Sequence, residues 1–339
     1  MNEEKKLYTV SASPHVKSSS TVTRIMLDVI IACIPALIAS VVLFGYRALA
    51  VTAVSVGTCV LSEYICRKVM KRNNTIGDLS AVVTGLLLAF NVPVTIDLWM
   101  VAFAAIVAIV VVKQFFGGIG MNFVNPALIG RIVLLASFPT AMSNWVQPFS
   151  WKTDVITTAS PLYELGELFK GGDVSAKAIS GVEKMPSLLD MFMGNRSGSL
   201  GEVCAVALLA GFIYLLIRRV IRPAIPLVYV GTVGIFMMFA GKFDFTFVLY
   251  EIMSGGLLLG AIFMATDYTT SPVNLKGRII YALGCGIITS LIRLFGSLPE
   301  GVSFAIIIMN ILTPHIENLT SPKPFGTEKA KKIKEAEAK

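Results

Sequence analysis

The stretch M-L-D-V-I-I-A-C-I-P-A-L-I-A-S-V-V-L-F-G, residues 26–45, decides the class of fold. It contains a single charged side chain, and about 20 apolar residues are what a helix needs to cross the hydrocarbon core of a bilayer. The sequence therefore predicts an all-α integral membrane protein with about ten transmembrane helices. The other apolar runs lie near residues 48–66, 78–93, 97–113, 126–140, 203–218, 223–241, 246–266, 278–295 and 302–318.

The composition agrees with this class. Hydrophobic residues make up 55% of the chain and charged residues 15%, which is too little charge to coat a soluble globule of 339 residues. The net charge of +8 lies in short clusters between apolar runs and in a lysine-rich tail, so we expect contact with membrane lipid and no nucleic-acid partner. A cleavable signal peptide is not expected, because a polar tail precedes a full-length first span.

Metal and disulfide sites are also not expected. The five cysteines are scattered singly along the predicted spans, which is typical of small packing residues. His15 and His315 are far apart in the sequence. We therefore predict no metal site.

The distribution of lysine and arginine predicts the orientation. With the N-terminus inside, the inner segments hold 20 Lys and Arg residues and the outer segments hold 8. Because basic residues accumulate on the cytoplasmic side, both termini are expected in the cytoplasm. The predicted organisation is a first membrane repeat over residues 1–140, an extracytoplasmic loop over 141–202, a second membrane repeat over 203–318 and a lysine-rich cytoplasmic tail over 319–339.

Internal similarity suggests that the two membrane halves are inverted repeats. The motif G-L-L-L at residues 85–88 returns at 256–259, and K-Q-F-F-G at 113–117 is similar to R-L-F-G at 293–296. Five spans in each half would give the two copies opposite orientations, as in many transport proteins. The spans 78–93 and 126–140 are short and interrupted by Gly, Asn or Pro, which predicts broken or re-entrant helices.

One polar stretch of the predicted outer loop carries a chemical signature. Residues 154–160 read D-V-I-T-T-A-S and fit the pattern Asp-x-x-Ser/Thr-(usually Gly)-Ala-Ser/Thr. This pattern is the acceptor signature for a flavin transferase, which moves FMN from FAD onto a hydroxyl as a phosphoester. The recognition residues would be Asp154, Thr157, Thr158 and Ala159, and Ser160 would be the acceptor.

A structural alternative explains the same residues. Ser160 followed by Pro161 is also typical of a helix start, with the serine as N-cap and the proline in the first turn. Thr158 stands where the signature usually has glycine, and the acceptor is serine rather than the commoner threonine. Thr158 and Thr157 are therefore the fallback acceptors.

Several motifs, in order along nearly the whole chain, resemble the RnfD subunit of the Rnf electron-transport complex. The resemblance is more distant to the NqrB subunit of the sodium-translocating NADH:quinone reductase. The motifs are S-P-H at residues 13–15, R-I-M-L-D-V at 24–29, I-P-A-L at 34–37, N-P-A-L at 125–128, G-R at 130–131, the acceptor stretch, A-T-D at 265–267, S-P-V at 271–273, G-R at 277–278, F-A at 304–305, M-N at 309–310 and Pro314.

The resemblance implies a role in electron transfer. It implies a covalent FMN on Ser160 that relays electrons within a redox-driven ion pump of the ferredoxin:NAD⁺ oxidoreductase type, in a prokaryotic cell (inner) membrane. The implied partners are a flavin-bearing extracytoplasmic subunit, membrane iron–sulfur subunits, cytoplasmic subunits facing NAD and ferredoxin, and a flavin transferase for maturation. The chain carries no nucleotide-binding loop or iron–sulfur cysteine set, so it is not expected to be active alone.

Other polar residues in the spans are candidates for a second, non-covalent flavin such as riboflavin, or for an ion path. Ionisable groups inside a membrane are costly and usually have a function or a partner. Asp28 and Asp267 are the main acidic candidates; Asn122, Asn125 and Asn310 lie beside prolines and could bond an isoalloxazine ring. Helix capping and structural pairing with a nearby Arg or Lys are the alternatives, and they apply equally to Glu63 and Glu251.

Two rival functions remain open from the sequence. A secondary transporter or channel for a small polar solute would also use inverted repeats and broken spans. The quinone-reductase counterpart would differ in its final electron acceptor. The acceptor stretch at 154–160 favours a flavin carrier over a plain transporter.

Overall fold

The computed structural model describes residues 21–152, 160–172, 176–182, 185–296 and 300–322. Every regular element within these residues is a helix. In chain order they are α1 (Val22–Phe44), α2 (Tyr46–Val69), η1 (Ile76–Asp78), α3 (Ser80–Phe90), α4 (Leu98–Ile106), η2 (Val107–Gln114), α5 (Pro126–Ser137), α6 (Pro139–Met142), η3 (Ser150–Lys152), α7 (Pro161–Lys170), α8 (Ala176–Gly181), α9 (Leu188–Met193), α10 (Ala205–Ile217), α11 (Ala224–Ala240), α12 (Phe245–Met253), α13 (Leu257–Leu259), η4 (Gly260–Met264), α14 (Leu275–Phe295) and α15 (Val302–Thr320).

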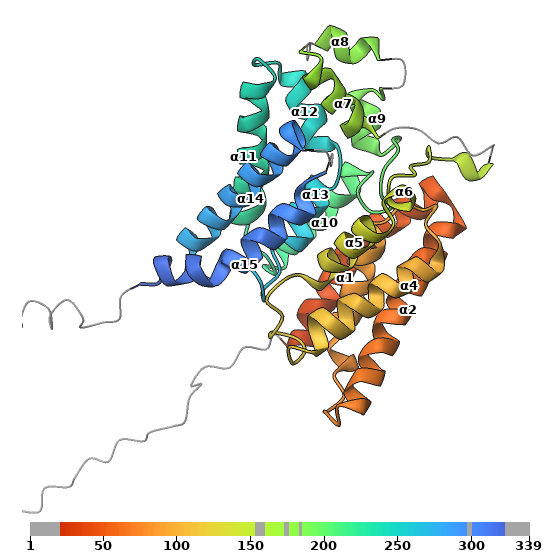
Figure 1. Ribbon diagram of the computed structural model, residues 1–339, viewed down its shortest axis with the longest axis vertical. Helices are drawn as coiled ribbons and strands as arrows, with labels where there is room; N and C mark the ends of the chain where they lie inside the picture. The colour runs from red at the N-terminus through yellow and green to blue at the C-terminus, as the bar shows by residue number, and fades with distance from the viewer. Residues whose placement is uncertain (1–20, 153–159, 173–175, 183–184, 297–299, 323–339) are drawn as a thin grey trace, which may run out of the picture.

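The helices form two groups that pack side by side (Figure 1). Helices α1 to α5 make one group and α10 to α15 the other, and the groups meet where α1 contacts α10 and α5 contacts α15. Helices α7, α8 and α9 lie together at one end of the molecule, which we call the cap end. The start of α1 and the end of α15 lie toward the opposite end, which we call the terminal end.

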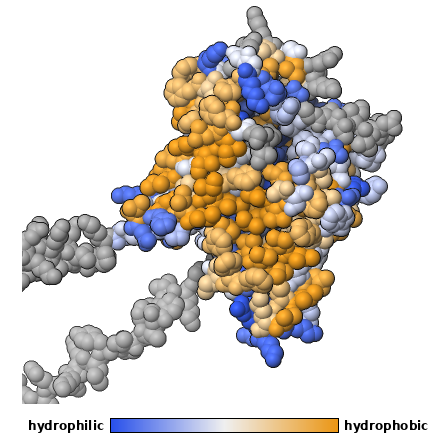
Figure 2. All heavy atoms as spheres, viewed as in Figure 1, coloured by the Kyte–Doolittle hydropathy of each residue, from blue (hydrophilic) through white to orange (hydrophobic). Residues whose placement is uncertain are grey.

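The length and apolarity of the helices identify a multi-pass membrane protein. Helices α1, α2, α14 and α15 are each long and apolar enough to cross a membrane, with mean hydropathy between 1.3 and 2.6. Five further apolar helices are shorter, and they include α3 and α5, the two spans predicted to be short. Apolar side chains cover the middle of the molecule, and hydrophilic ones gather toward its two ends (Figure 2).

The stretch predicted as one span over residues 246–266 is broken. Its two parts, Phe245–Met253 and Leu257–Met264, are bent by 65°. The break falls at Ser254-Gly255-Gly256, where Gly255 has φ +62°, a left-handed conformation that glycine adopts without steric cost. A Cβ at Gly255 would lie 3.0 Å from Leu162 of α7, so the start of α7 rests on this break.

The cap end has local order of its own. Ser187 is the N-cap of α9, and its hydroxyl donates to the Asp190 carboxylate at 2.6 Å. Hydrogen bonds from Ser187, and then from Asn195, hold the pKa of Asp190 below its ordinary value. The Tyr250 hydroxyl donates to the Pro186 carbonyl at 2.9 Å, which ties α12 to the segment before α9.

At the contact between the two groups of helices, we expect one glycine to be sensitive to substitution. A Cβ at Gly211 of α10 would lie 2.3 Å from the carbonyl oxygen of Ala32 in α1, because the two backbones approach closely there. Gly211→Ala should therefore lower the thermal unfolding midpoint of the detergent-solubilised protein, at a cost of about 1–3 kcal/mol for overpacking.

The matched control is Gly231→Ala in α11, where a Cβ would meet nothing within 4 Å. Alanine is the better helix former, so this variant should be as stable as the wild type or slightly more stable. Equal midpoints for the two variants would mean that the α1–α10 contact does not depend on Gly211.

Candidate functional site

A large pocket opens at the cap end beside the start of α7. Its cavity volume is about 540 Å³, within the range of about 300–1,000 Å³ that is usual for small-molecule sites. Its walls come from α5, α6, the start of α7 and the start of α15, so it lies between the two groups of helices. This cap-end pocket is lined by Arg131, Ile132, Leu135, Pro139, Thr140, Met142, Ser143, Trp145, Ser160, Tyr163, Glu300, Gly301, Ser303 and Phe304.

Ser160 lies at the wall of this pocket and also caps α7. Its backbone is extended, with φ −73° and ψ 146°, and its side-chain oxygen accepts from the Tyr163 N–H at 3.3 Å. Pro161 occupies the first helical turn. The predicted N-cap is therefore confirmed. The recognition residues Asp154, Thr157, Thr158 and Ala159 lie outside the described residues.

A buried arginine forms the inner wall of the cap-end pocket. Arg131 of α5 is 4% exposed and makes an ion pair with Glu300. Its Nη1 donates to Asn91 Oδ1 at 3.2 Å and to Ser303 Oγ at 3.0 Å. Arg131 lies inside the predicted span 126–140, and its partners could not be predicted because they lie far away along the chain.

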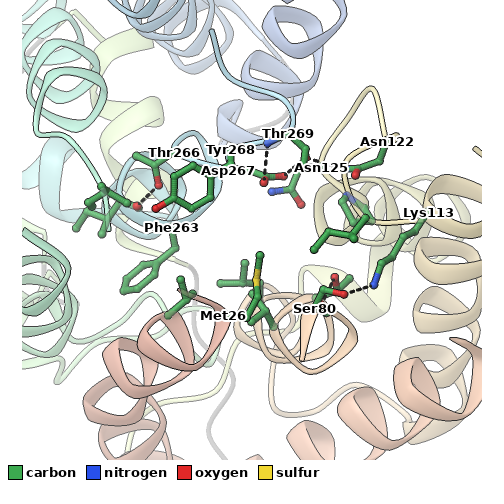
Figure 3. A pocket seen from close by; sticks show the side chains of 18 of the residues that line it. Met26, Ser80, Lys113, Asn122, Asn125, Phe263, Thr266, Asp267, Tyr268 and Thr269 are labelled. Atoms are coloured by element: carbon green, nitrogen blue, oxygen red, sulfur yellow. Dashed lines mark hydrogen bonds between the residues drawn. The ribbon is translucent and has the colours of Figure 1, made fainter. Parts of the chain in front are cut away.

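A second pocket lies at the terminal end, where α1, α3, α5 and the segment after η4 meet (Figure 3). Its cavity volume is about 90 Å³. The lining of this terminal-end pocket comprises Met26, Val29, Ser80, Val83, Thr84, Leu87, Lys113, Ile119, Asn122, Asn125, Pro126, Leu215, Ile221, Ile262, Phe263, Thr266, Asp267, Tyr268 and Thr269.

Three of the predicted polar residues meet at this pocket. Asn122 donates to Thr269 Oγ1 at 3.0 Å, and Asn125 donates to the Met264 carbonyl at 3.4 Å. The Asp267 carboxylate accepts from the N–H of Thr269 at 3.3 Å and from its hydroxyl at 3.1 Å (Figure 3). Turn chemistry around two broken helices thus brings together amides and a carboxylate that are far apart in the sequence.

The other two predicted residues lie elsewhere. Asn310 is 1% exposed, and its amide lies 2.7 Å from the Tyr281 hydroxyl, outside the lining of the terminal-end pocket. Asp28 makes an ion pair with Arg218 at 3.2 Å and accepts from the Tyr214 hydroxyl at 3.0 Å. For Asp28 the structure therefore supports the alternative of structural pairing.

A buried lysine completes the terminal-end pocket. Lys113, at the end of η2, is 3% exposed and pairs with Glu63 at 2.8 Å. It also donates to Ser80 Oγ at 2.6 Å (Figure 3). Lys113 ends the predicted span 97–113 and was counted among the basic residues of the inner segments; its burial was not predicted, because a lysine at the end of an apolar run usually reaches water.

Comparison with known proteins identifies the family. The NQR2, RnfD, RnfE family matches residues 9–326. The chain belongs to this family. A member in Acetobacterium woodii, the component designated D of the Na⁺-translocating ferredoxin:NAD⁺ oxidoreductase complex, is 44% identical over 96% of this chain and 97% of its own length.

Two further members of the NQR2, RnfD, RnfE family cover nearly the whole chain. The component designated D of the proton-translocating ferredoxin:NAD⁺ oxidoreductase complex of Clostridium ljungdahlii is 41% identical over 96% of this chain and 98% of its own. Its counterpart in the ion-translocating oxidoreductase complex of Escherichia coli is 31% identical over 95% and 99%. The resemblance to the RnfD subunit is therefore confirmed.

Proposed function

We propose that this chain is the RnfD subunit of an Rnf-type ferredoxin:NAD⁺ oxidoreductase and relays electrons through an FMN bound covalently to Ser160. One observation carries the proposal. The Ser160 hydroxyl, the last of the acceptor stretch, lies at the wall of a pocket large enough for a flavin ring. The relatives of this chain are named as the D components of such complexes. Such a subunit contributes to ion translocation only within its complex.

The residues of the cap-end pocket suit FMN. Trp145, Tyr163 and Phe304 give it aromatic surface, and Arg131 gives it positive charge. The N-terminus of α7 begins directly after Ser160, and the positive end of a helix dipole stabilises a phosphate group placed there. A phosphoester at Ser160 would therefore occupy a favourable electrostatic position, while the apolar walls exclude water from a bound ring.

The proposed attachment of FMN to Ser160 needs FAD as donor and no further reactant. The Ser160 hydroxyl oxygen attacks the phosphorus of the FMN half of FAD, and the new P–O bond forms as the pyrophosphate P–O bond breaks. AMP leaves, and the hydroxyl proton passes to a base or to water. The N-cap bond does not oppose this, because the Ser160 oxygen accepts a hydrogen bond there and is not tied up as a donor.

The first experiment uses the wild-type chain co-expressed with a flavin transferase. After full denaturation and gel electrophoresis, the band of this chain should fluoresce under ultraviolet light, because a phosphoester survives unfolding. A matched expression without the transferase should give a dark band. A dark wild-type band in the presence of an active transferase would refute the covalent FMN.

We also propose that the terminal-end pocket holds the second, non-covalent flavin, for which riboflavin is our candidate. The amides of Asn122 and Asn125 and the Asp267 carboxylate offer the donors and acceptors that an isoalloxazine edge requires. The cavity of about 90 Å³ is smaller than a three-ring flavin, so binding requires the lining side chains to move apart.

The amide of Asn122 gives a test of this second site. Asn122→Ala removes one of the amides proposed to bond the flavin, and also the bond that this amide donates to Thr269. The flavin released on denaturation should therefore fall at least tenfold relative to protein. Chromatography of the released flavin measures it, and the gel fluorescence of the covalent flavin should not change. Asn318→Ala, on the exposed side of α15, is the control. Equal release from both variants would argue against this pocket.

We further propose the ten-span, inverted-repeat topology. Two buried ion pairs at opposite ends support it: Lys113–Glu63 beside the terminal-end pocket, and Arg293–Glu251 beside the break that α7 covers. Lys113 and Arg293 occupy equivalent places in the repeated motif. Likewise, the terminal-end pocket lies at the start of α5 and the cap-end pocket at the start of α15.

The orientation follows from the same proposal. The excess of Lys and Arg in alternate loops supports a cytoplasmic terminal end and an extracytoplasmic cap end in a prokaryotic cell membrane. Ser160 would then be accessible to an extracytoplasmic flavin transferase and to a flavin-bearing partner subunit. The terminal-end pocket would face the partners that exchange electrons with ferredoxin and NAD⁺.

A further inference from the structure

The wall of the cap-end pocket contains a charge pair that attachment to Ser160 does not need. The side chains of Arg131 and Glu300 are 5% and 17% exposed, and both line the pocket. Arg131 Nε is buried and finds no acceptor among the described residues. Arg131 is thus a buried positive charge at the wall of a cavity of about 540 Å³, close enough to act on a ligand that fills it.

We infer that Arg131 raises, and Glu300 lowers, the reduction potential of the flavin bound at Ser160. The inference rests on the proposed function, because it concerns the flavin that the pocket would hold. It assigns to these two residues an electrostatic role in a site where Ser160 has the covalent one. The two side chains carry opposite charges, so the reduction potential of the flavin depends on the sum of their two effects.

The physical reason is the charge that reduction adds. When two electrons from a redox partner and one proton from water enter a flavin, the ring gains one negative charge. A guanidinium at the pocket wall stabilises that charge and favours the reduced form. A neighbouring carboxylate does the opposite. The effect is large in a buried site, because the effective dielectric constant there is well below that of water.

Other charges lie further from the cavity. Glu202 is close to Arg131, since a Cβ at Gly256 would lie 3.2 Å from Glu202 Oε2 and 3.7 Å from Arg131 Nη1. Glu202 is not among the lining residues, however, and its Oε1 already accepts from the Ser199 N–H at 2.9 Å. Arg131 and Glu300 are the charged side chains among the described residues that line this pocket.

The test is a spectroscopic redox titration of the purified chain that carries covalent flavin. Arg131→Gln should shift the reduction equilibrium at least tenfold toward the oxidised form, which lowers the midpoint potential by about 30 mV for a two-electron couple. Glu300→Gln should shift it at least tenfold the other way. Glu167→Gln, the same change of charge on the exposed face of α7, should leave the potential at the wild-type value.

The outcomes separate two failures. A fluorescent wild-type band would overturn the electrostatic inference and leave covalent FMN intact if the reduction equilibrium constants of both variants lay within threefold of wild type, or if both potentials shifted in the same direction. A dark wild-type band would refute the proposed function itself. If Arg131→Gln does not fold, Arg131→Lys and Glu300→Gln test the electrostatic inference instead. Arg131→Lys keeps the charge and should keep the midpoint potential near the wild-type value. Glu300→Gln must still raise the midpoint potential.

Discussion

The Ser160→Ala variant, co-expressed with a flavin transferase, should give a dark band on a denaturing gel where the wild type fluoresces. Alanine has no hydroxyl to attack the FMN phosphorus, so the loss should be complete. The fold should survive, because replacing a helix N-cap by alanine costs only about 0.5–2 kcal/mol. Thermal unfolding in detergent, measured beside the gel, separates loss of the flavin from loss of the protein.

Two variants control this result. Ser143→Ala removes another serine hydroxyl from the same pocket, and its band should stay as bright as the wild type. Ser160→Thr keeps both a hydroxyl and an N-cap, so it should restore fluorescence. Undiminished fluorescence in Ser160→Ala would instead transfer the attachment to Thr158 or Thr157, which the corresponding alanine variants would then distinguish.

Removal of one partner from a buried ion pair should cause the largest loss of stability. Arg293 of α14 and Glu251 of α12 have side chains 1% and 4% exposed, with 2.9 Å between Nη1 and Oε2. Arg293 also donates to the carbonyls of Glu251 at 2.6 Å and of Ser254 at 3.1 Å. Arg293→Ala would leave a carboxylate and the carbonyls of the helix break without their donor, at a cost of about 3–5 kcal/mol.

The measurement is the free energy of unfolding in mixed detergent, or the thermal midpoint where unfolding is irreversible. Lys170→Ala breaks an ion pair with Glu167 whose side chains are 59% and 51% exposed, and it should cost no more than about 1 kcal/mol. The double variant Arg293→Leu with Glu251→Leu should recover much of the stability, because it leaves no unpaired charge. If Arg293→Ala were as stable as Lys170→Ala, the buried pair would not hold the break.

Features that depend on local chemistry could be predicted from the sequence. Apolar runs identified the membrane class, and the serine–proline pair at 160–161 predicted the start of α7. Asn122 and Asn125 were chosen because they lie beside prolines, and Asp267 because it is an ionisable residue within a span; these three line one pocket, whereas Asn310, chosen on the same ground as the other asparagines, does not. In each case the signal is the side chain itself and its immediate neighbours, which the sequence displays directly.

Features that depend on distant partners could not be predicted. Arg131 and Lys113 are buried only because Glu300 and Glu63 reach them from other helices, and no spacing in the sequence indicates those pairs. The break at Ser254-Gly255-Gly256 was read as part of one span because most of the flanking residues are apolar. Its bend is fixed by packing against α7 and by Arg293, both remote along the chain.

The composition of the cap-end pocket bears on how the protein is made. Its walls include Arg131 of α5, Tyr163 of α7 and Phe304 of α15, the last helix among the described residues. During synthesis Ser160 leaves the ribosome well before α15, so the pocket is complete only after α15 has inserted. A prosthetic group added earlier would have no walls around it. A group bound at Ser160 would thus be enclosed by these walls only after residues 302–320 have been synthesised and inserted.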